Sequence, residues 1–374
     1  MTFARPGKRR VAMGLLIAAA ALLLGFGASY VASDDVRYLA HAGAEETRIL
    51  MHREPISHLA NDSTTPPALR AQASMVLQVR AFADSIGLAA NETFTTYSDV
   101  GRDTLLLVLT ASPRNCICPV TWKYPVAGRV PYKGFFDFEQ AHRAAGDYIL
   151  RGYDVNLRPS AAFSTLGWFN DPLLSTALTT DSVELATMVF HEIAHNTLWV
   201  KGATDFNESF AQWVGYNAAA LFFFRHGDST QGYRARARWQ DEQTLGDYYQ
   251  LLLHRLDSLY ALHLPDASND SGRAVIARWS HDTLVNGFGP LLHTYTVSHT
   301  IEKPINNAAL IGVRLYRTNL GLFDELQRRN GDDLIRALVA LRQAEAGATG
   351  AQGFEQLRAL VRQPPPVPSG ATAQ

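Results

Sequence analysis

The feature that most constrains the fold is a helix-forming segment that begins at Asp181 and carries two histidines one turn apart. Asp181, followed three residues later by Glu184, is a typical helix-capping signal, so we expect a helix from Asp181 to about Val200. This helix contains the sequence His191-Glu192-Ile193-Ala194-His195. Its apolar residues form one stripe, which predicts burial against a core: Leu185, Met188, Val189, Ile193 and Ala194.

The spacing of His191 and His195 is typical of a metal site. Positions i and i+4 share one helix face, so both imidazoles can bind one Zn²⁺ at about 2.0–2.1 Å. Glu192 is then placed to polarise a metal-bound water. The alternative is coincidence, which would give this spacing in roughly one chain in a hundred of this composition. A buried helix with three ionisable residues nevertheless requires a reason, because unpaired polar groups are costly there.

Catalytic zinc takes three protein ligands, so a third ligand is required. Glu208 is the best candidate, because the loop 201–205 can fold the next helix back onto the first. Two alternatives stay open. Glu208 could be a carboxylate favoured by a helix N-terminus, and Asp205 could be the ligand instead.

The motif and the segment Asn207-Glu208-Ser209-Phe210-Ala211 together resemble the gluzincin metallopeptidases, the group of thermolysin and the alanyl aminopeptidases. A closer resemblance, over about residues 40–360, is to a bacterial envelope family described as aminopeptidases. It implies a zincin-like fold, zinc bound by His191, His195 and Glu208, and Glu192 as general base. The glutamate-containing GxMEN segment of the alanyl aminopeptidases has no counterpart here, and no lipobox cysteine occurs at 25–29. The matching segments are 131–136, 164–172, 191–195, 206–211, 306–308 and Tyr316.

Other site residues follow less directly from the sequence. We expect Tyr316 to donate to the developing oxyanion, with His281, His299 and Tyr295 as rivals and a packing role as the alternative. Asn207 either orients a ligand or caps a helix. The segment Ser164 to Phe169 is either a substrate-binding edge strand or a plain core strand.

The order of elements predicts an α+β fold with a small mixed sheet, an active-site helix and a helical C-terminal subdomain. The predicted units are residues 1–33, an α+β part 34–205, a helical part 206–362 and a disordered tail 363–374. Helices are expected at 69–86, 138–150 and 238–262, the last ended by Pro265. Strands are expected at 93–97, 104–110, 126–132, 153–157 and 162–169.

The N-terminal residues 11–32 contain no charged side chain and follow four cationic residues, Arg5, Lys8, Arg9 and Arg10. We therefore expect a single membrane span with the catalytic domain on the periplasmic side. The alternative is a signal segment cleaved near Val31-Ala32-Ser33, which would release the protein into the periplasm. Cys116 and Cys118 are expected to be small buried thiols, because extended neighbours two apart point to opposite sides.

These observations predict a zinc-dependent peptidase of the bacterial cell envelope, most simply an aminopeptidase, acting on a peptide or polypeptide. An envelope zinc endopeptidase and a non-catalytic, zinc-stabilised interaction module are the alternatives. The 34 Lys and Arg residues balance 35 Asp and Glu residues, which argues against a nucleic-acid partner. The physiological substrate and the oligomeric state are left open.

Overall fold

The structure is a computed structural model that describes residues 8–124, 128–160, 172–297 and 303–363. Helices dominate and the strands are short, so the α+β class is confirmed, while the zincin-like fold stays a prediction. The helices are α1 (Lys8–Ala32), α2 (Asp34–Met51), α3 (Ile56–Asn61), α4 (Pro67–Ser85), α5 (Phe138–Leu150), α6 (Ser182–Thr197), α7 (Thr204–Arg225), α8 (Ser229–Tyr260), α9 (Asp266–Asp282), α10 (Asn307–Tyr316), α11 (Leu320–Arg329), α12 (Leu334–Ala344) and α13 (Gln352–Arg362).

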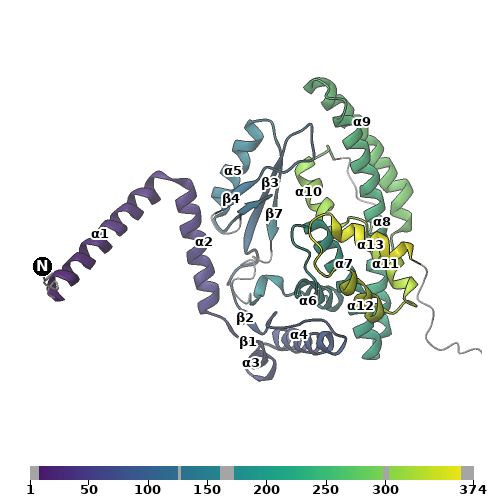
Figure 1. Cartoon of the computed structure of the whole chain (residues 1–374), viewed down its shortest axis with the longest axis horizontal. Coiled ribbons are helices and arrows are strands. Elements are labelled where there is room, and N and C mark those ends of the chain that lie inside the picture. Colours follow the sequence, from purple (N-terminus) through teal and green to yellow (C-terminus); the bar gives the residue numbers. More distant parts are fainter. Residues whose placement is uncertain (1–7, 125–127, 161–171, 298–302, 364–374) are drawn as a thin grey trace, which may run out of the picture.

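The main sheet is antiparallel, with β3 (Leu106–Ser112) between β6 (Lys133–Phe135) and β7 (Asp154–Ser160). Every residue of β3 is buried, because both faces of this strand are covered. On one face, Leu107 and Leu109 pack with residues of α5. Helix α10 lies against β3 and β7 (Figure 1). The remaining strands are β1 (Glu54–Pro55), β2 (Thr96–Ser98), β4 (Trp122–Tyr124), β5 (Gly128–Val130) and β8 (Leu173–Leu174).

The largest core lies in the helical part, where α6 and α7 pack on each other and on α4, α11, α12 and α13. Aromatic residues fill it, including the fully buried Phe190, Phe206, Trp213 and Phe323. Burial of so much aromatic surface is the main favourable term for this layer, at about 25 cal/mol per Å² of apolar area. It holds α6 and α7 firmly together.

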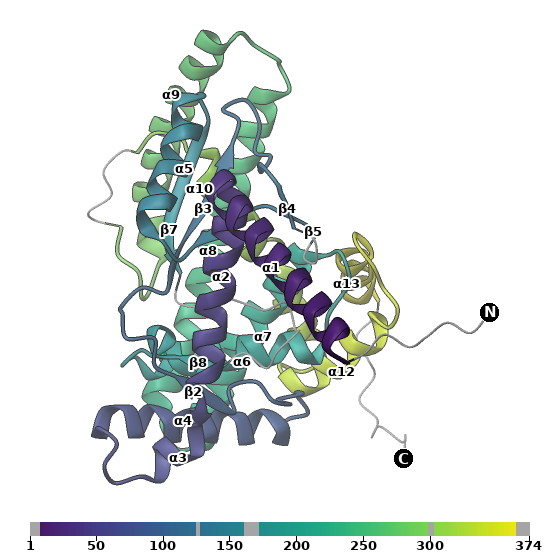
Figure 2. The same cartoon turned by 90° about the vertical axis from the view of Figure 1, so that its left-hand side faces the viewer.

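The N-terminal residues form α1, which covers the predicted apolar segment, and α2, which the sequence analysis missed (Figure 2). Ser33 caps α2 by accepting from the backbone N–H of Val36 at 3.4 Å, and two aspartates occupy its first turn. Among the described residues, no single helix has both the length and the apolarity needed to cross a bilayer. The segments Leu16–Ala32 and Asp34–Met51, bent by 113° at their junction, meet that requirement only as a pair.

Several predicted boundaries agree with the structure. Helix α5 spans the predicted 138–150, and Asp181 is the N-cap of α6, which ends three residues before the expected Val200. The predicted strand at 93–97 is shifted to β2. Of the predicted strand 126–132, residues 126 and 127 lie outside the described residues, 128–130 form β5, and 131 and 132 connect β5 to β6. The candidate edge strand at 164–169 and the tail from residue 364 lie outside the described residues.

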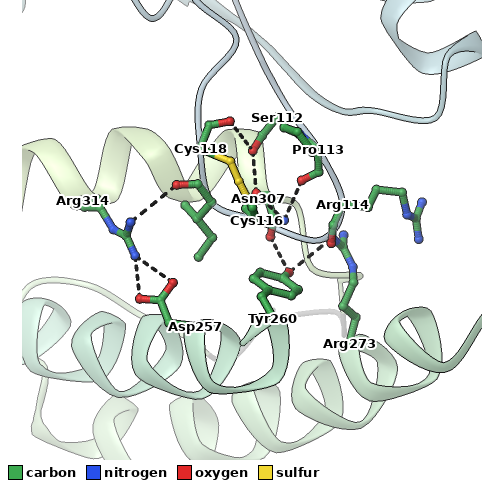
Figure 3. The surroundings of a disulfide bond; sticks show 11 residues. Ser112, Pro113, Arg114, Cys116, Cys118, Asp257, Tyr260, Arg273, Asn307 and Arg314 are labelled. Carbon is green, nitrogen blue, oxygen red and sulfur yellow. Dashed lines mark hydrogen bonds and ion pairs between the residues drawn. A yellow bond between two sulfur atoms is a disulfide. The ribbon is translucent and has the colours of Figure 1, made fainter. Parts of the chain in front are cut away.

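The expectation of two buried free thiols is wrong, because Cys116 and Cys118 form a disulfide (Figure 3). The chain turns after β3, so the two Cα atoms are 5.4 Å apart, within the range that a disulfide spans. The Ser112 hydroxyl hydrogen bonds to the carbonyl oxygens of Cys116 and Cys118 at 2.9 and 3.0 Å. Cys118 is exposed rather than buried. The assumption of an extended chain failed at this turn.

Candidate functional site

Three predicted metal ligands come together between α6 and α7. The Nε2 atoms of His191 and His195 are 3.3 Å apart. The Oε2 atom of Glu208 lies 3.4 Å from the first and 3.8 Å from the second. All three side chains are largely buried, with 13–18% of their surface exposed. One nitrogen or oxygen atom of each residue therefore points at a common centre.

This arrangement fits a zinc ion. A tetrahedral zinc with ligand distances of about 2.0–2.1 Å would hold its ligand atoms about 3.3–3.4 Å apart. The separations of 3.3, 3.4 and 3.8 Å in the triad are close to that value. Two imidazole nitrogens and one carboxylate oxygen are also a donor set that zinc accepts. The triad of His191, His195 and Glu208 can thus hold zinc with little rearrangement.

The N-cap of α6 fixes where the histidines lie. The Asp181 carboxylate accepts hydrogen bonds from the backbone N–H groups of Val183 and Glu184, at 3.0 and 3.2 Å. The same carboxylate binds Arg234 and Arg238 of α8, at 2.5 and 2.6 Å. Asp181 therefore starts the helix and also ties its first turn to α8.

Asn207, the neighbour of Glu208, fastens the start of α7. It is fully buried, its side-chain oxygen accepts from the N–H of Val200, and its NH₂ donates to the Val200 carbonyl, both at 2.9 Å. Asn207 does not cap the helix, whose N-cap is Ala203. Its side chain also makes no hydrogen bond to His191, His195 or Glu208. Asn207 instead fixes the connection between the two ligand-bearing helices.

A close approach between these helices occurs at Gly215 of α7. A Cβ atom at this position would lie 2.9 Å from the carbonyl oxygen of Thr187 and 3.5 Å from the Cβ of His191. Because Gly215 is near Thr187 while Glu208 is near His195, the two helices run antiparallel, as predicted. Only glycine allows this separation.

The charges of the triad favour cation binding. Burial, followed by the neighbouring His191, lowers the pKa of His195 to about 4, although Glu208 acts in the opposite direction. Burial raises the pKa of Glu208, but a hydrogen bond from His191, the charges of both histidines and a hydrogen bond from Tyr316 outweigh it and lower that pKa. At neutral pH, His195 is therefore neutral with a free lone pair and Glu208 is ionised.

Tyr316 lies beside the triad. Its ring stacks on that of His191 with the centroids 6.4 Å apart, and its hydroxyl is close enough to Glu208 to help lower the pKa of that carboxyl. Burial raises its pKa, as do the charges of Glu208 and Glu192, while Arg158 lowers it. Tyr316 thus stays a neutral hydrogen-bond donor. Glu192 is exposed on α6 next to His191, near enough to affect Tyr316.

Helix α10 holds Tyr316 in its last turn, and its first turn is anchored to β7. Asn306 caps the helix and donates to the carbonyl of Val155 at 2.8 Å. The N–H of Asn307 donates to Asp154 at 2.8 Å, and Asp154 forms a buried ion pair with Arg273 at 2.6 Å. The two asparagines therefore fix the helix that carries Tyr316.

Three residues at the site were not predicted from the sequence. Tyr132, between β5 and β6, lies where the charge of Glu208 raises its pKa further, after burial as the main cause. Arg158 of β7 lowers the pKa of both Tyr132 and Tyr316. The exposed Trp199 contacts His195 with its ring edge at 5.5 Å between centroids. Tyr132 belongs to the segment 131–136, which resembles the envelope family. That resemblance was the sequence signal that could have pointed to Tyr132.

The rival residues lie elsewhere. Asp205 accepts from the N–H of Phe206 at 2.9 Å and is not part of the triad. The Tyr295 hydroxyl donates to Glu242 at 3.2 Å, and His281 lies at the end of α9. His299 lies outside the described residues. Among the described candidates for the oxyanion donor, Tyr316 is the one that contacts the triad.

Comparison with known proteins places the chain in a family. A family model with the description "Putative aminopeptidase" matches residues 37–351. This range includes the triad, Glu192, Tyr132, Arg158 and Tyr316. No curated protein and no solved structure matches the chain.

Proposed function

Because the chain belongs to the family described as "Putative aminopeptidase", which suggests peptidase activity, we propose that it is a zinc-dependent peptidase, most simply an aminopeptidase of the bacterial envelope. One observation carries the zinc dependence. Two imidazole nitrogens and a carboxylate oxygen converge within 3.3–3.8 Å of one another, beside Glu192 and Tyr316. Three protein ligands leave a coordination position open, as catalytic zinc requires.

Each residue then has a distinct role. His191, His195 and Glu208 would hold the metal. Bound zinc would act as a Lewis acid toward the peptide carbonyl and would lower the pKa of water. Glu192 would take a proton from the attacking water and return it to the leaving amine. Tyr316 would donate a hydrogen bond to the carbonyl oxygen as that oxygen gains negative charge.

The proposed location is the periplasmic side of the cytoplasmic membrane, with the N-terminal segment as anchor or cleaved signal. The charge-free residues 11–32 after a cationic stretch support this. The disulfide between Cys116 and Cys118 supports it independently, because disulfides persist in oxidising compartments. A reporter fused after Arg362 should be active only outside the cytoplasm, and activity in the cytoplasm would contradict the topology.

The test uses the full chain, a free peptide, its N-acetylated form, and metal analysis. Glu192→Gln should keep one zinc per chain and lose about 10²–10⁴-fold in turnover, since the amide cannot accept the proton. His191→Ala should lose both zinc and activity, because two ligands cannot hold the metal. Glu184→Gln, on an exposed position of the same helix, is the matched control and should retain both.

The outcomes separate the proposal from its alternatives. Hydrolysis of the free peptide alone indicates an aminopeptidase, and equal hydrolysis of the acetylated peptide indicates an endopeptidase. Stoichiometric zinc in His191→Ala would contradict the ligand assignment. Zinc binding without hydrolysis of any peptide would favour the non-catalytic module.

A further inference from the structure

Strand β7 and helix α10 start side by side, and the helix packs against the strand. Asp154, the first residue of β7, accepts from the N–H of Asn307, the first residue of α10. Four further strand residues at about 3.3 Å each lead to Arg158, a distance of about 13 Å. Nine further helix residues at 1.5 Å each lead to Tyr316, also about 13 Å. Because the helix packs against the strand, these equal lengths place Arg158, near the end of β7, at the level of Tyr316, on whose hydroxyl its charge acts.

The face of the sheet agrees with this placement. Arg158 pairs in register with Val108, and Asp154 pairs with Ser112, so both lie on one face of β7. The opposite face carries Val155 and Leu157, which pack with the residues of α5. Arg158 therefore lies on the α10 side, where its charge acts on the hydroxyls of Tyr132 and Tyr316.

Arg158 differs from the other arginines near α10. Arg273 is paired with Asp154, and Arg317 with Glu242 at 2.7 Å. Among the described residues, no carboxylate forms an ion pair with Arg158, and its side chain is exposed. A guanidinium held beside a catalytic site without an anionic partner is a site for a carboxylate of the ligand, which it can bind through two parallel hydrogen bonds.

The charges around the site lead to the same conclusion. Glu192 and Glu208 together would balance a divalent cation. Arg158 then leaves one positive charge in excess, which a ligand with a single carboxylate would neutralise. A peptide cleaved close to its C-terminus brings such a carboxylate to within a residue of the scissile bond.

We propose that Arg158 binds a substrate carboxylate next to the scissile bond, so that the preferred substrates are very short peptides with a free C-terminus. This inference rests on the proposed peptidase function. Its test measures ligand binding and does not require hydrolysis. An acidic side chain could supply the same carboxylate, and the probes below distinguish the two sources.

The experiment measures binding of three probes to the full-length Glu192→Gln variant by ligand-observed NMR. The probes are alanyl-alanine, its C-terminal amide, and the amide of alanyl-aspartic acid. We expect the free acid to bind about 10–100-fold more tightly than alanyl-alanine amide, the range for a charge-assisted hydrogen bond. Adding Arg158→Gln should abolish the difference, and Arg158→Lys should keep part of it. Arg143→Gln, an exposed arginine on α5, is the matched control.

A preference for the aspartyl amide that depends on Arg158 would assign the carboxylate to a substrate side chain and would still support the site. Equal affinities for the free acid and the amide would overturn the proposal. An equal loss of affinity for all three probes in Arg158→Gln would overturn it as well. Hydrolysis by the wild-type chain is measured separately. If the chain binds the free acid through Arg158 but cleaves nothing, the peptidase function fails and the carboxylate site stands.

Discussion

The helical side of the site and the sheet side are assembled in different ways. On the helical side, α6 and α7 supply His191, His195 and Glu208 from 18 consecutive residues. On the sheet side, Tyr132, Arg158 and Tyr316 come from three segments that span 185 residues. The first side depends on one short connection between two packed helices, whereas the second depends on contacts across the whole fold. Under the proposed function, we therefore expect that metal binding and substrate handling can be separated by mutation.

The largest effect expected from the sheet side is that of Tyr316→Phe. Loss of a donor that acts mainly in the transition state should lower turnover by about 10²–10³-fold, with the Michaelis constant and the zinc content nearly unchanged. Steady-state kinetics and metal analysis measure this directly. Tyr248→Phe, which removes a buried hydroxyl bonded to Ser280 at 2.5 Å, is the control and should change only the melting temperature. Near-normal turnover in Tyr316→Phe would remove this tyrosine from the mechanism.

On the helical side, Asn207→Ala should cost about 2–4 kcal/mol in the free energy of unfolding. The substitution leaves the N–H of Val200 buried without a partner, which costs about 1–3 kcal/mol. It also removes one hydrogen bond to the Val200 carbonyl, worth about 1 kcal/mol, although that carbonyl still accepts from the N–H of Ala203 at 3.2 Å. Zinc affinity should fall by about 10–100-fold, since the clamp fixes the helix that carries Glu208. Urea unfolding and zinc competition measure the two quantities.

The control for that variant is Asn217→Ala, which removes a bond of 2.9 Å to the Trp213 carbonyl within the same helix. It should leave zinc affinity unchanged. Equal effects of the two substitutions on zinc affinity would show that Asn207 has no special role in the connection.

These comparisons also explain what could be predicted from the sequence. Asp181 and the histidine spacing are local signals, so the start of α6 and the helix face that carries His191 and His195 were predictable. Tyr316 was predicted only through its resemblance to a family, because nothing local distinguishes it from a packing tyrosine. Arg158 carries no local signal: its position follows from the register of β7 on β3 and from the anchoring of α10. The disulfide was missed because a turn after β3 breaks the assumed extended chain.

The smallest expected effect concerns stability alone. It involves Glu345, which follows α12 on the helical side. Both of its carboxylate oxygens are buried and have no hydrogen-bond partner among the described residues, and burial raises its pKa to about 7. The folded chain therefore binds more protons than the unfolded chain between about pH 4.5 and 7, and stability falls as the pH rises through that range.

Glu345→Gln should accordingly raise stability above pH 7 by up to about 3 kcal/mol and give no gain near pH 4, since a shift of one unit corresponds to about 1.4 kcal/mol. Thermal unfolding at both pH values measures the difference. Glu355→Gln, at an exposed position of α13, should have no such pH dependence. A gain of the same size at pH 4 would contradict the assigned cause.

The close approach at Gly215 determines the direction from which molecules can reach the metal-binding residues. The backbones of α6 and α7 are in contact there, and the aromatic core lies behind them. Among the described residues, these two helices therefore leave no room for a ligand between them at Gly215. We therefore expect a ligand of the triad to contact the sheet side, where Tyr132, Arg158 and Tyr316 lie. An inhibitor selective for this protein would thus gain its selectivity from contacts with these three side chains, rather than from a group that binds the triad alone.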